Sequence, residues 1–371
     1  MKFMIKWGLL LIPALALAMP ASAQVRPATL SDSEEPGSVI VFPKFIKGTV
    51  TLPEGGTAPA TEIEIGVVCP KGSTCAEHQS VKVRLHWVCP GSQDPFFKYV
   101  CRETDFDITL SVFEKAVIVP DGSFTTVSNK SVPAAGCDRG YLIGWVIRPS
   151  DDRPIKFDGL IGDAVLRESG TAMAAYNAIP IQADPALVTT AVVTTNGNGA
   201  LLFDGLAGHY QMVTGRVFGD VRYTNLTPNA QFPVRSEGFL TLLTLDVKSN
   251  RPNNPLFVDL DFFGGNPSFI GNENVLSTFS EFICWEEVAL TSIDPSLTTA
   301  FMGRKGVFAS GPAAKEQIFG ITDTSGPATL LGLIETTEGP AASPRAYFSN
   351  LYNDSVPIPT RFRPGTSPIF F

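Results

Sequence analysis

Charged side chains are scarce in this chain, and histidine is scarcer still. Aspartate, glutamate, lysine and arginine make up 17% of the 371 residues, and there are 3 histidines. The net charge of −8 is spread along the chain without a basic block. Such a charge pattern gives a nucleic-acid partner no electrostatic support, so we expect none.

The sequence also lacks the short signatures of several enzyme classes. It contains no Gly-x-Ser-x-Gly elbow, no His-Glu-x-x-His motif and no phosphate-binding glycine loop. His209 is the single histidine outside the cysteine-containing region. A pair of acids for sugar hydrolysis is defined by distance and leaves no spacing in the sequence. We therefore predict no catalytic residue and leave the question of enzymatic activity open.

Long apolar runs are absent after the first residues of the chain. The run Trp7–Met19 follows a basic start and precedes an Ala-x-Ala site that ends at Ala23. This arrangement is typical of a secretory signal peptide, because the run is too short to span a bilayer core of about 30 Å. We expect residues 1–23 to be cleaved and no transmembrane helix to remain. The sequence thus predicts a secreted, periplasmic or cell-surface protein.

Glycine and proline, in contrast, are abundant, with 33 and 30 residues. They suit many short strands joined by tight turns. Apolar residues alternate with polar ones over 61–69 and again over 81–89. Alternation places one set on a buried face, with His86 on the face opposite Cys89. We interpret 61–101 as an antiparallel hairpin around which the rest of the chain is organised.

Further strands are expected along the whole chain. Residues 141–147 are apolar on both faces, which is typical of a strand in the middle of a sandwich. Residues 187–194 and 200–203 flank the turn 196–199 and predict a hairpin. The other predicted strands are 38–42, 48–52, 106–112, 157–167, 213–223, 239–247, 256–263, 282–290, 299–309, 329–335 and 345–352.

These patterns predict an all-β fold of antiparallel β-sandwiches, jelly-roll or immunoglobulin-like, held by disulfides. Residues 24–36 are polar and are expected to form a flexible leader. A stretch of small side chains over 169–186 lacks periodicity and marks a boundary. We expect a first sandwich region over 37–182 and a second over 183–371. They form either two domains or one closely packed body.

All six cysteines follow the predicted cleavage site, and an even number in an exported chain favours disulfides. The spacing favours two local bridges, Cys69–Cys75 and Cys89–Cys101, because each closes a turn that contains proline or glycine. Cys137–Cys284 then forms a third bridge. That bridge ties the two halves of the chain together.

Two groups of residues have ligand chemistry that suits metal ions. His78 and His86 lie among the first four cysteines, but their spacing matches no known zinc site, so disulfides are favoured over zinc. Oxygen-bearing side chains later in the chain suit Ca²⁺, although the EF-hand spacing is absent and such residues are also common in turns. Calcium is therefore the one candidate cofactor. The candidate calcium ligands are Asp259, Asp261, Asn272 and Glu273.

Glu286 shares its parity with Cys284 and Val288, which would place a carboxylate on an apolar strand face. A buried carboxylate is costly without a partner. It is therefore either a functional acid, one half of an ordinary ion pair, or returned to solvent by a β-bulge over 285–287. The bulge and the ion pair are the favoured interpretations.

The predicted function is a non-catalytic structural, adhesive or binding role outside the cytoplasm. The partner would be a surface, a protein or a glycan, contacted by loops between strands such as 90–97 and 264–274. An exported hydrolase acting on a polysaccharide is the alternative, and two carboxylates facing each other across a cleft would favour it. Residues 369–371 resemble the last strand of outer-membrane barrels, a second alternative that Pro368 argues against.

Overall fold

The computed structural model describes residues 34–213 except 77, 91–100, 124–130, 170–171 and 198. It further describes 216–222, 235–245, 256–263, 276–282, 284–289, 292, 316–323, 329–339, 345–350 and 352–353. Strands make up nearly all of the regular structure in these ranges, and every named strand pair is antiparallel. The prediction of an all-β, disulfide-bonded fold is confirmed.

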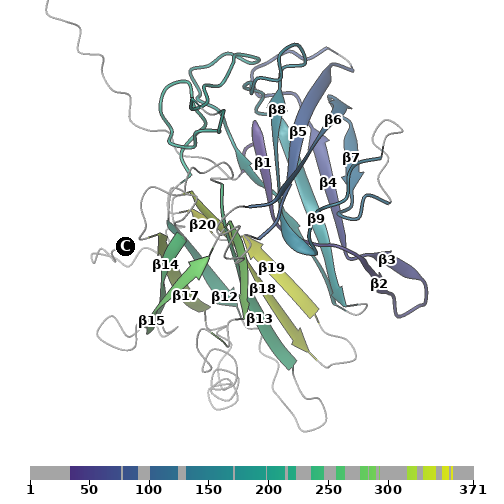
Figure 1. Ribbon diagram of the computed structural model, residues 1–371, viewed down its shortest axis with the longest axis vertical. Coiled ribbons are helices and arrows are strands. Elements are labelled where there is room, and N and C mark those ends of the chain that lie inside the picture. Colours follow the sequence, from purple (N-terminus) through teal and green to yellow (C-terminus); the bar gives the residue numbers. More distant parts are fainter. Residues whose placement is uncertain are drawn as a thin grey trace, which may run out of the picture.

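Residues 39–181 form two large sheets, shown in the upper part of Figure 1. The first has the order β11-β1-β8-β5-β6 and the second β10-β9-β4-β7. The strands of the first sheet are β1 (Val39–Ile46), β5 (Ser80–Val88), β6 (Glu103–Ser111), β8 (Arg139–Ile147) and β11 (Ile179–Ile181). Those of the second are β4 (Thr61–Val67), β7 (Lys115–Ile118), β9 (Leu160–Ser169) and β10 (Ala172–Asn177). A small hairpin adds β2 (Thr49–Thr51) and β3 (Thr57–Pro59).

Residues 216–353 form two more sheets, with the orders β15-β14-β17-β12-β20 and β16-β13-β18-β19. The first of these contains β12 (Arg216–Arg222), β14 (Leu256–Phe263), β15 (Leu276–Phe282), β17 (Glu316–Asp323) and β20 (Tyr352–Asn353). The second contains β13 (Arg235–Thr244), β16 (Trp285–Ala289), β18 (Leu330–Gly339) and β19 (Arg345–Asn350). The boundary predicted near 182 stays a prediction, because β1 of the first half contacts β13 and β18 of the second.

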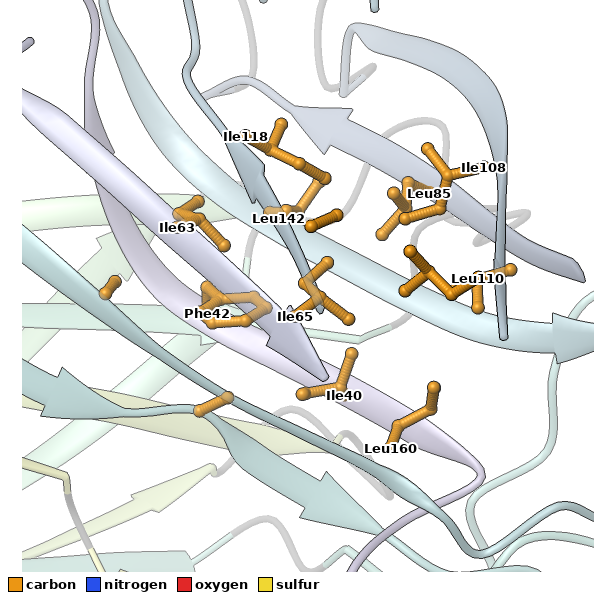
Figure 2. Close-up of a cluster of buried hydrophobic side chains, with 14 of the residues drawn as sticks. Ile40, Phe42, Ile63, Ile65, Leu85, Ile108, Leu110, Ile118, Leu142 and Leu160 are labelled. Carbon is orange, nitrogen blue, oxygen red and sulfur yellow. The ribbon is translucent and has the colours of Figure 1, made fainter. Parts of the chain in front are cut away.

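The main core lies between the first two sheets, as Figure 2 shows. Phe42 of β1 and Leu142 of β8 face Ile63 and Ile65 of β4 across this layer, and all four are buried. Alternation in each strand sends every second side chain inward, so two sheets can share one apolar layer. Full burial of each such side chain stabilises the fold by about 1.5–3 kcal/mol. The two sheets are therefore held together by this layer, and the side chains that alternate with it lie on their outer faces.

The predicted hairpin over 61–101 is wrong, although its strands exist. β4 pairs with β7 and β9, whereas β5 pairs with β6 and β8 in the opposite sheet. The connection carrying Cys69 and Cys75 crosses from one sheet to the other instead of making a tight turn. Alternation specifies which face of a strand is buried but not the strand it pairs with. The buried side chains of β4 and those of β5 therefore belong to one core and face each other across it.

Residues 187–203 do not form the predicted hairpin. The structure shows isolated bridges there, Ile155 with Val192 and Thr195 with Leu201, in place of paired strands. A turn does occur at the expected position, because the Gly199 N–H donates to the Asn196 carbonyl over 2.9 Å. Val193 of this segment packs onto the first sheet rather than onto a strand partner, since it is buried in a cluster with Val39 and Ile181.

The predicted strand 282–290 is divided between two sheets. β15 ends at Phe282 and pairs with β14, while β16 begins at Trp285 and pairs with β13. Cys284 lies between them with φ 65°, in the left-handed region, where a non-glycine residue marks a sharp change of chain direction. By contrast, the prediction for 256–263 coincides with β14, and β8 is buried on both faces as expected.

No helix in the described part of the chain is long and apolar enough to cross a membrane.

Candidate functional site

Three disulfides connect the six cysteines, and one of the three predicted pairs is confirmed. Cys69–Cys75 is present as expected. The predicted pairs Cys89–Cys101 and Cys137–Cys284 are wrong, because the bridges are Cys89–Cys137 and Cys101–Cys284. Cys137 packs against the inner core and Cys101 against the cluster on the other side of the first sheet. Cys89 and Cys101 thus face opposite sides of one sheet and cannot meet, despite their short spacing.

The outer face of the first sheet is buried beneath residues from later in the chain. Val41 and Tyr141 of this sheet share an apolar cluster with Tyr210, Leu243 and Trp285. The Tyr141 hydroxyl donates to the Thr244 carbonyl over 2.9 Å. The part of this outer face around β1, β8 and β11 is therefore covered, whereas Lys82 and Arg84 of β5 on the same face remain partly exposed.

A buried ion cluster lies where β1 meets the second half of the chain. Lys44 is fully buried, and its Nζ lies 2.6 Å from Glu335 Oε2 and 2.5 Å from Glu287 Oε2. Arg139 also pairs with Glu287. The Trp285 indole N–H donates to the Pro43 carbonyl over 2.8 Å beside this cluster. Lys44 and Glu335 are enclosed, while Arg139 reaches the surface, so the cluster joins the two halves of the chain at their contact.

The alternation of apolar residues placed Glu286 on the apolar face of β16, but the glutamate that joins the buried cluster at Lys44 is Glu287. Glu286 is partly exposed, whereas the side chain of Glu287 is 10% exposed and contacts both Lys44 and Arg139. The break at Cys284 ends the continuous alternation on which the assignment of Glu286 depended. The β-bulge expected over 285–287 is wrong, because these residues pair with β13 in unbroken register, and the buried ion pairs are those of the neighbouring Glu287.

His86 forms a second cluster with two acids of the neighbouring strand β6. Its Nδ1 lies 2.9 Å from Glu103 Oε2 and 3.0 Å from Asp105 Oδ1. Asp105 is the register partner of His86, and Glu103 is two residues away on the same face of β6. The imidazole is held by burial, with 3% of the side chain exposed, and by the Trp145 ring at a centroid distance of 4.5 Å. Asp105, in contrast, is 59% exposed, so the cluster opens to solvent.

Next to this cluster, two cations and two acids form a surface network. Lys82 lies 2.9 Å from both Asp107 and Asp152, and Arg84 binds the same two carboxylates. Hydrogen bonds from Lys82 and then Arg84 hold the pKa of Asp152 below its usual range. Burial by itself raises the pKa of Asp107, but the hydrogen bonds from Arg84 and Lys82 together lower it. Both acids of the network therefore stay charged and paired.

Asp152→Asn is expected to lower the melting temperature slightly at pH 7, by about 1–2 °C, because exposed pairs contribute little. A carboxyl with a lowered folded-state pKa stabilises the fold above its unfolded-state pKa, near pH 4, and this contribution disappears as the pH falls further. The difference from wild type should therefore vanish in melting curves below about pH 3. A difference that persists at that pH would contradict the role given to the charge.

The outer face of the second sheet is exposed and carries apolar side chains among charged ones. We call it the β4–β9 face. Register partners on β7, β4 and β9 lie side by side on this face. One such set is Lys115, Gly66 and Ile161, and the next is Val117, Glu64 and Asp163. The exposed apolar residues of this face and of the adjoining β6–β7 turn are Val117, Ile161, Met173 and Phe113.

Glu64 and Asp163 are the two acids at the centre of the β4–β9 face. They are register partners on neighbouring strands, and Lys115 Nζ lies 2.9 Å from Glu64 Oε2. Burial raises the pKa of Asp163, and the adjacent Glu64 charge raises it further, while Lys115 lowers it. This pair stands on one sheet surface and does not face across a cleft, so it does not provide the geometry expected for a hydrolase.

His209 lies with Asp204 in the segment that covers the first sheet. His209 Nδ1 is 2.7 Å from Asp204 Oδ1, and the Leu206 N–H also donates to that oxygen. Within the described residues, no hydroxyl hydrogen-bonds to His209. The pair therefore orders the turn 204–209 and lacks the nucleophile of a catalytic triad.

The candidate calcium ligands are only partly placed by the structure. Asp259 and Asp261 lie in β14, where Asp259 is the register partner of Phe279 and of Thr322. Asn272 and Glu273 are outside the described residues, as are all of the predicted contact loop 264–274 and all but the first residue of the loop 90–97. The calcium site stays a prediction. The ligand-like group that the structure does bring together, His86 with Glu103 and Asp105, was missed, because no spacing in the sequence encodes the register of β5 with β6.

Comparisons with known proteins give little to set beside this geometry. No family model and no curated protein matches the chain. Two structures of the lectin from Pleurotus ostreatus, one in complex with GalNAc and one in the apo form, are each 11% identical to it. The alignments cover 88% and 91% of this chain and 84% and 87% of the lectin chains, with TM-scores of 0.11 and 0.12. Similarity at that level carries no argument.

Proposed function

We propose that the chain is an exported, non-catalytic binding protein that contacts a protein partner through the β4–β9 face and the adjoining turn. The observation that carries this proposal is Phe113, whose side chain is 77% exposed in the β6–β7 turn. Three disulfides support export, because such bridges persist in oxidising compartments.

Phe113 is unusual in its backbone as well as in its exposure. Its φ of 72° lies in the left-handed region, which a bulky residue adopts only when the surroundings impose it. The Phe113 N–H donates to the Val67 carbonyl over 2.7 Å, which fixes the turn against β4. A polar residue or glycine would satisfy this turn at lower cost. The presence of a strained and exposed aromatic ring at this turn supports a role in binding.

The chemistry of the β4–β9 face suits a protein better than a glycan. Val117, Ile161 and Met173 are exposed aliphatic or thioether side chains, and such groups pack against other proteins. The charged residues between them include both signs, since Lys115 pairs with Glu64 and Arg167 with Glu62. An apolar surface interrupted by paired charges gives both contact area and specificity.

Retention by washed cell envelopes of the producing organism tests this proposal. We expect Phe113→Gly to weaken retention of the purified protein at least tenfold while leaving its melting temperature equal or higher, because glycine relieves the positive φ. Ile161→Asp should weaken retention similarly. Val188→Asp is the matched control, because Val188 is 75% exposed but lies in the segment over the first sheet. Protease treatment of the envelopes should remove the binding sites, and periodate treatment should leave them.

Three results would overturn the proposal. Wild-type protein that is not retained at all would contradict a binding role at the envelope. Equal retention of wild type and Phe113→Gly would contradict the β4–β9 face as the contact surface. Loss of retention after periodate, with no effect of protease, would replace the protein partner with a glycan.

A further inference from the structure

We propose that His86, Glu103 and Asp105 form a binding site for a first-row divalent transition-metal ion, of which Zn²⁺ is the best fit. Each residue offers one ligand atom, and the three atoms lie within 4.8 Å of one another. The site is independent of the β4–β9 face, because it lies on β5 and β6 of the other sheet.

The spacing of the ligand atoms fits a coordination shell. The distances from Nδ1 to the two carboxylate oxygens are 2.9 and 3.0 Å. Neighbouring ligands about 2.1 Å from an ion are separated by about 3.0 Å in octahedral and about 3.4 Å in tetrahedral geometry. For a tetrahedral site, each nitrogen–oxygen distance therefore has to lengthen by only about 0.4 Å. The exposed Asp105 side chain can move by that amount.

The charges at the cluster also favour a divalent cation. A neutral imidazole has a single N–H to share between Glu103 and Asp105, whereas a divalent ion neutralises both carboxylates. These acids have no other cationic partner among the described residues. Asp107, on the same face of β6, is satisfied by Arg84 and Lys82 instead. The register of β5 with β6 thus pairs Asp107 with cations but brings the other two acids to His86.

The donor set selects the kind of ion. Imidazole nitrogen with two carboxylates suits Zn²⁺ and its first-row neighbours, while Ca²⁺ prefers six to eight oxygen ligands. Ligation through Nδ1 requires the proton on Nε2, a buried atom with neither a donor nor an acceptor among the described residues, so no contact there fixes the other tautomer. All six cysteines are oxidised, so thiolates do not compete for the ion. Water completes the shell on the exposed side.

The local fold pre-organises the site. Burial and the Trp145 ring fix the imidazole, so little side-chain entropy is lost at that ligand when the ion binds. Glu103 is 19% exposed and Asp105 is 59% exposed. Asp105 is therefore the ligand that can move when an ion enters. The site lies at the free edge of the first sheet, because β6 has no partner strand beyond it in the described residues. An ion can therefore reach the site without unfolding of the core.

Calorimetric titration of the mature, disulfide-bonded protein with ZnCl₂ tests the site. We expect one bound Zn²⁺ per chain and a rise in melting temperature, with no comparable response to CaCl₂. Asp105→Asn and Glu103→Gln should each weaken Zn²⁺ binding at least tenfold while the folded circular dichroism spectrum is kept. Asp107→Asn is the matched control on the same strand face and should bind like wild type.

The titration also has outcomes that reject the site. Absence of Zn²⁺ binding to wild-type protein would mean that the histidine is held only by hydrogen bonds. Equal weakening by Asp107→Asn and Asp105→Asn would show diffuse attraction by an acidic surface. Retention of full affinity in both Asp105→Asn and Glu103→Gln would place the ion elsewhere. None of these results bears on the binding role of the β4–β9 face, which the envelope experiment tests separately.

Discussion

Lys44→Met is expected to lower the free energy of unfolding by about 3–5 kcal/mol, because it removes the charge from a fully buried ion cluster. The Lys44 Nζ lies 2.6 Å from Glu335 Oε2 and 2.5 Å from Glu287 Oε2. Methionine replaces the apolar stem but leaves two carboxylates facing each other away from water. Arg139 still pairs with Glu287, so most of the loss arises at Glu335. Urea denaturation at pH 7, followed by tryptophan fluorescence, measures the change.

Two further variants separate the buried charge from other effects. Lys71→Met removes a lysine that is 85% exposed and paired with Glu35 at the surface, so it should change stability by less than about 0.5 kcal/mol. Lys44→Met combined with Glu335→Leu should recover part of the lost stability, because the pair is then replaced by apolar groups. If Lys44→Met costs no more than Lys71→Met, the two halves do not meet through this cluster.

The sequence predicted which side chains are inside more reliably than which strands are partners. Ile63, Ile65 and Leu85 alternate as expected and are buried in one core. Their pairing was wrong because a period of two carries no information about the neighbouring strand. In particular, the connection after β4 contains the proline and glycine of a turn and a local disulfide, yet it crosses the sandwich. Only the competition among all strands for partners decides this choice.

Candidate sites were harder to predict, because they depend on the pairing register of neighbouring strands and on which segments pack onto each sheet. Alternation did place His86 on the face opposite Leu85, but its neighbour there is the Trp145 ring of β8, which itself packs against an apolar cluster with residues far along the chain. Its acids lie 17 and 19 positions after it, and they reach it through the register of β5 with β6. Lys44 and Glu335 are separated by 291 positions. No local pattern records contacts of this range.

Cysteine spacing failed for a related physical reason. Cys89 and Cys101 are close along the chain, but one side of the sheet contains Cys137 and the other contains the layer around Trp285. A bridge needs sulfur atoms on the same side, with Cα atoms about 4.4–6.8 Å apart. The Cα separations of 5.8 Å for Cys89–Cys137 and 6.0 Å for Cys101–Cys284 meet this condition. The side of the sheet, and not the chain separation, determined the pairing.

The double variant Cys101→Ala/Cys284→Ala is expected to lose about 5 kcal/mol of stability in the chain-entropy treatment of cross-links. This bridge closes a segment with a sequence separation of 183 residues, so it removes much conformational freedom from the unfolded chain. It also joins Cys101, two residues before β6, to the crossing between β15 and β16. Guanidinium denaturation under non-reducing conditions measures the loss, and mass spectrometry of unreduced peptides checks the pairing.

Cys69→Ala/Cys75→Ala is the matched control, because it removes the same number of sulfur atoms from a bridge with a sequence separation of 6 residues. The same treatment of loop closure gives about 2 kcal/mol for so short a loop. A larger cost for the long bridge would therefore reflect the longer loop that it closes, since a general effect of losing two cysteines is shared by both variants. Equal costs, or recovery of a Cys89–Cys101 peptide, would contradict the arrangement of layers that also brings Lys44 to Glu335.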